Sequence, residues 1–215
     1  MSAPQKSGAP DQVASRSARA EASRQRILDA AARCFVDVGY QRTRFEDVAS
    51  LAGVSRALVY NYFDSKPNLL TQVRDRALAG WQRSVAPEIA RSEGAAAKLR
   101  AMIQRTLLYA RTRPLLQAIL ADDVRVAVLG SEPTARGAID AWRQQIAEIL
   151  RSGVEAGEFH PGLDVSHSAD VLRAMQMGVI DRMHRPDGPI DVSSESHVAA
   201  MVEIVLRGVT RDQTR

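Results

Sequence analysis

The chain has 215 residues, of which 45% are hydrophobic and 25% are charged, and these ordinary globular proportions exclude a wholly disordered protein. Its single cysteine, Cys34, excludes an internal disulfide and a thiol cluster for zinc, and it is typical of a protein of the reducing cytoplasm. The formal net charge is +4, with ten Lys or Arg against seven Asp or Glu in residues 1–66, so the chain can have a polyanionic partner.

Residues 1–20 are rich in Ala, Ser, Pro and Gln and have almost no large apolar side chains. Burial cannot offset the entropy of ordering such a segment, so the composition predicts a disordered basic arm. The segment has no apolar run that could form the core of a signal peptide, and no later stretch has the uninterrupted apolar length needed to cross a bilayer. We therefore expect a soluble, cytoplasmic protein.

The next residues predict three helices in close succession. Apolar residues recur at helical spacing from Ile27 to Val38, and Gly39 then ends the first helix. Thr43 stands three residues before Glu46, which is the capping-box pattern, and predicts a short second helix that Gly53 ends. Ser55 can cap a third helix. Two short helices joined by a glycine turn and packed on a longer one are typical of a helix-turn-helix, which gives residues 21–67 as one domain.

The rest of the chain, residues 68–215, also reads as helical. Either Asp64 or Ser65 can cap a fourth helix, whose pattern breaks at Pro87 and Gly94. Further helical patterns follow: one that ends before Pro114, a strongly apolar segment at 115–129, one that ends near Gly157, one at about 165–184 that Asp164 can cap, and a last one at about 193–209. No segment alternates as a strand would and no fixed repeat is present. The sequence predicts an all-α protein with about nine helices.

The third helix carries the chemistry of a DNA reader on its outward side. A helix that starts at Ser55 turns Val59 and Phe63 inward and leaves Arg56, Ala57, Tyr60 and Asn61 outside. Arg56 suits bidentate contact with guanine or a phosphate grip, and the small Ala57 could touch a thymine methyl. Six side chains offer further contacts. The hydroxyls of Thr43, Ser55, Tyr60 and Tyr62 and the ammonium of Lys66 can bind phosphate oxygens, and Arg44 could reach the DNA backbone or a groove edge.

Folding alone offers a second explanation for these residues. Tyr62 and Phe63 could be core, Tyr60 an ordinary surface aromatic, and the basic side chains could be solvated. Each residue taken singly fits that explanation. Their order, together with the caps and the turn glycine, favours DNA binding.

The run 43-TRFEDVASLAGVSRALVYNYFDSKPNLL-70 resembles the N-terminal signature of the TetR family of bacterial transcriptional regulators. A Thr-started second helix leads to an Ala-Gly-Val-Ser turn, then to a Tyr-x-Tyr-Phe segment and a Lys-started fourth helix. The resemblance covers about residues 24–70. Ala57 stands where the family most often has glycine, and Pro67-Asn68 replaces the usual acidic or polar pair.

The resemblance implies DNA contacts through the positions listed here: Thr43, Ser55, Arg56, Ala57, Tyr60, Asn61, Tyr62 and Lys66. It also implies that residues from about 68 onward sense a ligand and form a homodimer through the last two long helices. The large apolar surface of these two helices favours such a pairing. Such a dimer would read a palindromic, double-stranded operator. The arm arginines, Arg16, Arg19, Arg24 and Arg26, either lie in a minor groove or stay in solvent.

We expect a largely apolar small-molecule effector to release the DNA by shifting the protein towards a conformation that binds DNA less tightly. Members of the family usually repress transcription, so we expect a repressor. Residues that could line its pocket, or equally be plain core, are Trp81, Met102, Tyr109, Leu116, Leu120, Trp142 and Met175. No cofactor or metal is expected, because the four histidines lack zinc-ligand spacing and no phosphate-binding glycine loop is present. A helical enzyme and a DNA-binding protein without ligand control remain the alternatives.

Overall fold

The computed structural model describes residues 9–120, 133–184 and 194–210. Its helices are α1 (Ala9–Asp37), α2 (Phe45–Ala52), α3 (Arg56–Tyr62), α4 (Lys66–Arg91), α5 (Ala95–Ala110), α6 (Pro114–Leu120), α7 (Pro133–Glu155), α8 (Val165–His184) and α9 (Glu195–Val209). These ranges contain no strand, only a single antiparallel bridge between Phe159 and Thr210. The all-α prediction with about nine helices is confirmed.

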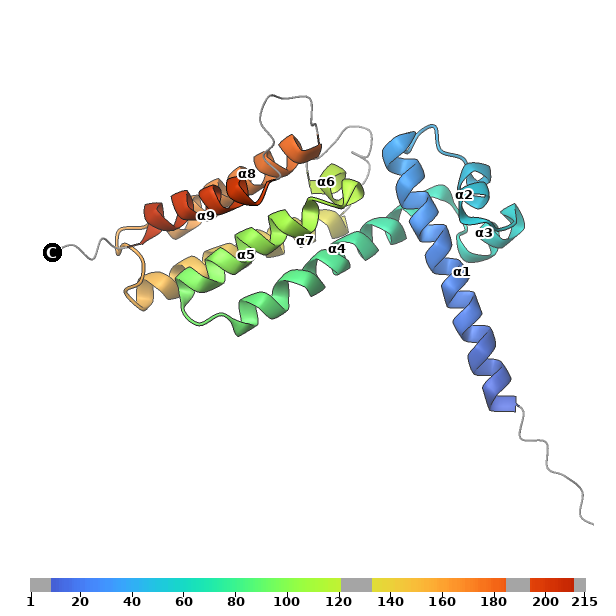
Figure 1. Ribbon diagram of the computed structural model, residues 1–215, viewed down its shortest axis with the longest axis horizontal. Coiled ribbons are helices and arrows are strands. Elements are labelled where there is room, and N and C mark those ends of the chain that lie inside the picture. The colour runs from blue at the N-terminus through green and yellow to red at the C-terminus, as the bar shows by residue number, and fades with distance from the viewer. Residues whose placement is uncertain (1–8, 121–132, 185–193, 211–215) are drawn as a thin grey trace, which may run out of the picture. The chain divides into compact units, whose positions relative to one another are not determined.

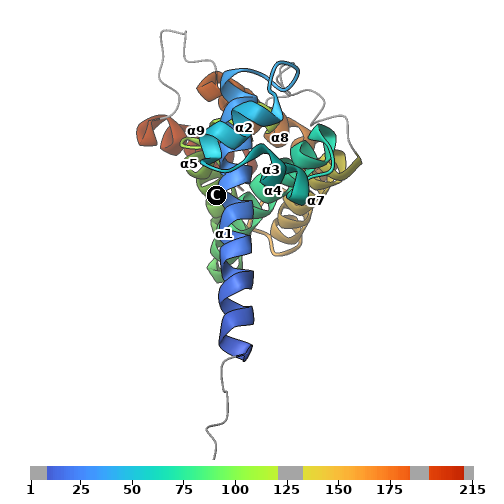
Figure 2. The same ribbon diagram turned by 90° about the vertical axis from the view of Figure 1, so that its right-hand side faces the viewer.

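The chain separates into two compact units, Met1–Val73 and Arg74–Arg215. In the first unit α2 packs against both α1 and α3, and Figures 1 and 2 show α2 and α3 beside the C-terminal half of α1. Its core consists of apolar side chains that are almost completely buried, among them Ile27, Phe35, Val48, Val59, Phe63 and Leu69. Gly53 joins α2 to α3 with φ 63° and ψ 42°, a left-handed conformation that glycine adopts without steric cost.

In the second unit α5 packs against α7 and α9, and α8 packs against α6 and α7. The start of α5 is held by Glu158, whose carboxylate accepts the backbone N–H groups of Ala95 at 2.9 Å and Ala96 at 3.0 Å. These bonds, first that of Ala96 and then that of Ala95, lower the pKa of Glu158 below its ordinary value. Gly153 leaves room for the fully buried Phe159, since a Cβ there would lie 2.2 Å from the Phe159 ring.

Three helix boundaries differ from the sequence prediction. The first is that α1 begins at Ala9, so residues 9–20 are helical where a disordered arm to residue 20 was expected. Alanine and arginine favour helix, and adding residues to an existing helix avoids the unfavourable nucleation step. Residues 9–20 therefore become ordered as an extension of α1, and the side chains of residues 15–20 stay exposed within it.

The second difference lies at the start of α2, where Arg44 rather than Thr43 occupies the cap position. The Arg44 backbone N–H donates to Asp47 Oδ2 at 2.8 Å, one residue out of phase with the predicted Thr43–Glu46 pair. The third is that α4 continues through Pro87 to Arg91, although a break was predicted. Position 87 is exposed, so water can bond the carbonyl that the missing proline N–H leaves free. Ser65 caps α4, and residues 121–129 of the predicted apolar helix lie outside the described ranges.

Among the described residues, no helix has both the length and the apolar character required to span a membrane.

Candidate nucleic-acid interface and ligand-binding core

The outward face of α3 is built by one cap and two buried anchors. Ser55 Oγ accepts the Leu58 backbone N–H at 3.2 Å and so starts the helix. Val59 and Phe63 are both 0% exposed and fix which side of α3 faces the core. The opposite side presents Arg56, Ala57, Tyr60 and Asn61, all of them exposed, as the sequence predicted. The face combines long hydrogen-bond donors, an amide and one small residue, which is what contact with base edges requires.

Arg56 is held in place by neighbours on two helices. Its Nη1 atom lies 2.7 Å from Glu46 Oε1 of α2, and its Nη2 atom donates to the Tyr60 hydroxyl at 3.4 Å. The Tyr60 ring packs on Phe45 with a centroid distance of 4.7 Å. The hydrogen bond to Tyr60 and then the charge of Glu46 raise the pKa of Arg56 above its ordinary value. Arg56 is therefore charged and positioned, and Glu46 competes with DNA for its guanidinium. Sequence reasoning missed Glu46 in this role, since ten residues separate the pair.

Two predicted phosphate contacts, Thr43 and Lys66, are placed otherwise. Thr43 is 2% exposed, and its hydroxyl bonds to the carbonyl oxygens of Gly39 at 2.9 Å and Cys34 at 3.1 Å. The Lys66 ammonium donates to the carbonyl oxygens of Tyr40 at 3.0 Å, Gln41 at 3.1 Å and Thr43 at 3.1 Å. An ammonium has three donors, so none remains for DNA in this arrangement. Both side chains hold the turn before α2.

The other predicted contacts divide in the same way. The Tyr62 hydroxyl donates to the Ala20 carbonyl at 3.0 Å and ties α3 to α1. Arg44 is exposed at the start of α2. Arg24 donates to Gln72 and its guanidinium carbon lies 6.0 Å from the Phe63 ring centroid, whereas Arg16 and Arg19 are exposed on the extended part of α1. The structure thus gathers Arg44, Arg56, Ala57, Tyr60 and Asn61 into one exposed set, with Ser55, Tyr62, Thr43 and Lys66 supporting it.

The predicted pocket residues of the second unit are brought together only in part. Trp81 of α4 and Trp142 of α7 are buried, with ring centroids 4.4 Å apart. Met102, Leu116 and Leu120 are also buried and Tyr109 is half-buried, beneath the Arg113 guanidinium at 3.6 Å. Met175 is the exception, because its side chain is 38% exposed on the outer side of α8. It therefore lies apart from the buried tryptophans, and its place in an effector pocket stays a prediction.

Gln176, the next residue, occupies the inward position instead. It is 1% exposed, and its Oε1 atom accepts the Trp142 indole N–H at 3.2 Å. The Trp81 indole N–H donates to Thr106 Oγ1, also at 3.2 Å. Sequence reasoning missed Gln176 and Thr106 because it sought apolar residues. The buried stripe Ala169, Leu172, Gln176 and Ile180 would have shown the phase of α8.

The outer side of α8 and α9 carries large apolar side chains. Val171 is 57% exposed, Met175 38% and Ile204 66%. A groove of about 340 Å³ lies between the two helices, lined by Leu163, His167, Ser168, Val171, Leu172, Met175, Ile204, Val205, Gly208 and Val209. Exposed apolar surface of this kind is typical of an interaction site.

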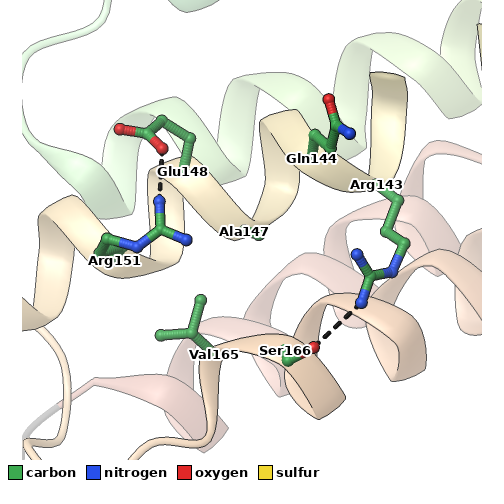
Figure 3. A pocket seen from close by; sticks show the side chains of 7 residues that line it. All are labelled: Arg143, Gln144, Ala147, Glu148, Arg151, Val165 and Ser166. Carbon is green, nitrogen blue, oxygen red and sulfur yellow. Dashed lines mark hydrogen bonds and ion pairs between the residues drawn. The ribbon is translucent and has the colours of Figure 1, made fainter. Parts of the chain in front are cut away.

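A second, more polar groove lies between α7 and the start of α8. Figure 3 shows Arg143 of α7 directed across it to Ser166 of α8, and Arg151 directed to Glu148 on its own helix. The Arg143 guanidinium also bonds to Asp170, whose hydrogen bond raises the pKa of Arg143 above its ordinary value. Since each arginine has a carboxylate partner nearby, this groove has little net attraction for an anion.

Comparison with known proteins gives three findings. Residues 27–73 match the model of "Bacterial regulatory proteins, tetR family". The chain is 28% identical over 206 residues to the HTH-type transcriptional repressor KstR2 of Mycolicibacterium smegmatis, an alignment that covers 95% of each protein.

Solved structures share the fold. The ketosteroid transcriptional regulator KstR2 of Mycobacterium tuberculosis superposes with a TM-score of 0.72 at 22% identity, over 88% of this chain and 95% of that one. The regulator FadR from Bacillus subtilis in complex with stearoyl-CoA superposes with a TM-score of 0.70 at 20% identity, over 86% and 98%.

Proposed function

Because the chain belongs to the TetR family of bacterial transcriptional regulators, we propose that it is a repressor that binds a palindromic operator as a homodimer and is released by a small-molecule effector. The observation that carries the proposal is the outward face of α3, where Arg56, Ala57, Tyr60 and Asn61 stand exposed above a rigid core. Acting on bacterial DNA, the protein would work in the cytoplasm.

In this proposal the DNA-binding domain comprises residues 21–67. Within it, Arg56 and Asn61 contact base edges. Arginine suits guanine and asparagine suits adenine, in each case through two hydrogen bonds in the major groove. Arg44 and Tyr60 contact the phosphate backbone and fix the register. Thr43, Ser55, Tyr62 and Lys66 act indirectly, by holding α2 and α3 in position through the bonds described above.

The homodimer forms in this proposal through α8 and α9. The exposure of Val171, Met175 and Ile204 supports it, because a second copy would remove this apolar surface from water. A two-fold dimer also matches the need to place two copies of α3 on the half-sites of one palindrome.

The effector binds in this proposal within residues 68–215 at the tryptophan-lined core. Two similar proteins indicate its chemistry: KstR2 is described as a ketosteroid regulator, and FadR was solved with stearoyl-CoA. Both names point to a large apolar molecule that carries a carbonyl group. Such a ligand would lower DNA affinity by binding more tightly to a conformation that does not fit the operator.

The test is binding to the DNA upstream of the chain's own gene, compared with a scrambled duplex at one fixed salt concentration. We expect clear preference for the upstream DNA, and we expect Arg56→Ala to lose about five- to hundredfold of that preference, as a lost bidentate base contact does. The matched control is Arg83→Ala, an exposed arginine of α4 in the second unit, which should change nothing. Equal affinity for the two duplexes, or an equal loss in both variants, would refute the proposal.

A further inference from the structure

The core of the second unit contains an amide that is only half bonded. Gln176 is 1% exposed, and its Oε1 atom accepts the Trp142 indole N–H at 3.2 Å, while its Nε2 atom is buried without a hydrogen-bond partner. Two other buried polar side chains of this unit are bonded: Thr106 accepts from Trp81, and Gln117 donates to the carbonyl oxygens of Ala110 and Arg111. Gln176 therefore carries donor capacity that the bonded core around it does not use.

The hydrogen bond from Trp142 determines which end of the Gln176 amide is the oxygen and which is the nitrogen. An indole N–H can only donate, so the atom that faces Trp142 must be the oxygen of Gln176. The nitrogen, with its two hydrogens, must then be the atom without a partner. Exchanging the two would leave Trp142 without an acceptor and would bring donor against donor.

The surroundings specify what could complete the amide. Trp81 and Trp142 form an apolar wall of two indoles at 4.4 Å, and the groups bonded to them are a hydroxyl and the amide itself, none of which is charged. A carboxylate placed against these groups would lose its hydration without gaining a counter-charge from them, which is highly unfavourable. An uncharged carbonyl oxygen accepts an N–H without that cost.

We propose that Gln176 Nε2 donates to a carbonyl oxygen of the effector, a ketone or thioester, while Trp81 and Trp142 cover the adjoining apolar part of the molecule. The inference rests on the proposed function in assuming that an effector binds the second unit. It adds the specificity-determining group and the chemical class that this group selects.

The protein offers its own reporter for the test. Trp81 and Trp142 are the only two tryptophans of the chain, so intrinsic fluorescence reports on this site alone. Two matched probe pairs differ only in the carbonyl: stearoyl-CoA with its thioether analogue S-octadecyl-CoA, and cholest-4-en-3-one with cholest-4-ene. Each pair is titrated into the wild type, into Gln176→Met, which keeps the side-chain volume, and into Gln104→Met, the same change at an exposed position of α5.

We expect the wild type and Gln104→Met to bind the carbonyl member of at least one pair about tenfold or more tightly than its partner, and Gln176→Met to bind both members alike. An equal preference in wild type and Gln176→Met would overturn the inference and leave a buried water as the partner of the amide. Fluorescence that no probe changes would overturn it as well.

Operator release, measured in parallel, separates this inference from the proposed function. If carbonyl and carbonyl-free probes release the operator equally, the role of Gln176 is wrong and effector control stands. If the operator is bound specifically and none of the four probes releases it, effector control by this class of molecule is wrong too.

Discussion

Replacing Lys66 by methionine separates the two roles that a lysine at this position can have. Its ammonium donates to three backbone carbonyl oxygens, those of Tyr40, Gln41 and Thr43, at 3.0–3.1 Å, and lies 4.6 Å from the Tyr40 ring centroid. Methionine keeps most of the side-chain length and removes the charge and all three donors. Because these bonds hold the turn before α2, the change should lower stability and leave the number of phosphate contacts to DNA unchanged.

The magnitude follows from the three bonds. A hydrogen bond to a charged group contributes about 1.5–3 kcal/mol when buried, but Lys66 is half-buried and solvent screens part of this. We therefore expect a loss of about 2–3 kcal/mol in the free energy of unfolding. For a chain of this size that corresponds to a melting temperature lower by about 4–12 °C. Lys98→Met on α5 is the control for the loss of one positive charge.

Two measurements decide between the roles. Thermal unfolding followed by circular dichroism gives the stability, and operator affinity over a series of salt concentrations gives the number of phosphate contacts. Removing one such contact lowers the slope of log affinity against log salt by about 0.9. An unchanged melting temperature with a slope reduced by that amount would refute the structural assignment and restore Lys66 as a phosphate contact.

Four other changes test different parts of the molecule. Glu46→Gln should tighten DNA binding roughly two- to fivefold, because an exposed ion pair contributes up to about 1 kcal/mol and Arg56 no longer has to leave it; weaker binding, measured by anisotropy, would show that Glu46 positions Arg56 instead. Ile204→Glu should give a folded monomer by light scattering, while Ala199→Glu on another side of α9 stays dimeric; two dimeric variants would place the interface elsewhere. The free energy of unfolding should fall as the pH drops from the ordinary glutamate pKa down through the lowered pKa of Glu158, because the protonated carboxyl no longer accepts both N–H groups. Acid titration followed by circular dichroism should show that Glu158→Gln lacks this part of the acid sensitivity. Deleting residues 1–18 should weaken operator binding and flatten its salt dependence, and an unchanged salt slope would show that the arm does not contact DNA.

The sequence predicted the helices well where local rules decide them. Ser55 and Asp164 act as caps, with the backbone N–H groups of Leu58 and His167 as donors, because capping depends only on neighbours two or three residues away. Gly53 ends α2 for the same local reason. The outward set on α3 followed from helical periodicity alone, since Val59 and Phe63 fix its phase.

Where the structure gives a predicted side chain another partner, the contact joins distant segments. Lys66 and Thr43 carry groups that can bind phosphate, but the fold brings backbone carbonyls of the turn before α2 within reach of both. No spacing rule shows that Lys66 lies 26 residues from its partner Tyr40 along the chain and 3.0 Å from it in space. The chemistry of a side chain predicts what it can bind, and the fold decides which of its possible partners it meets.

The bonds that basic side chains make within the first unit also affect how strongly the protein is attracted to DNA. Three basic side chains of the first unit already have partners within it. Lys66 donates to backbone carbonyls, Arg24 donates to Gln72, and Arg56 forms an ion pair with Glu46. The bonds of Lys66 and Arg24 to neutral oxygens fix where these two positive charges lie without cancelling them, whereas Glu46 offsets part of the charge of Arg56. The helical extension of α1 carries Arg16 and Arg19 exposed, beyond the core that α2 and α3 cover. Long-range attraction to the duplex therefore draws on this extension as well as on the exposed Arg44, whereas the choice of base sequence depends on α3, so the two properties should respond to different substitutions.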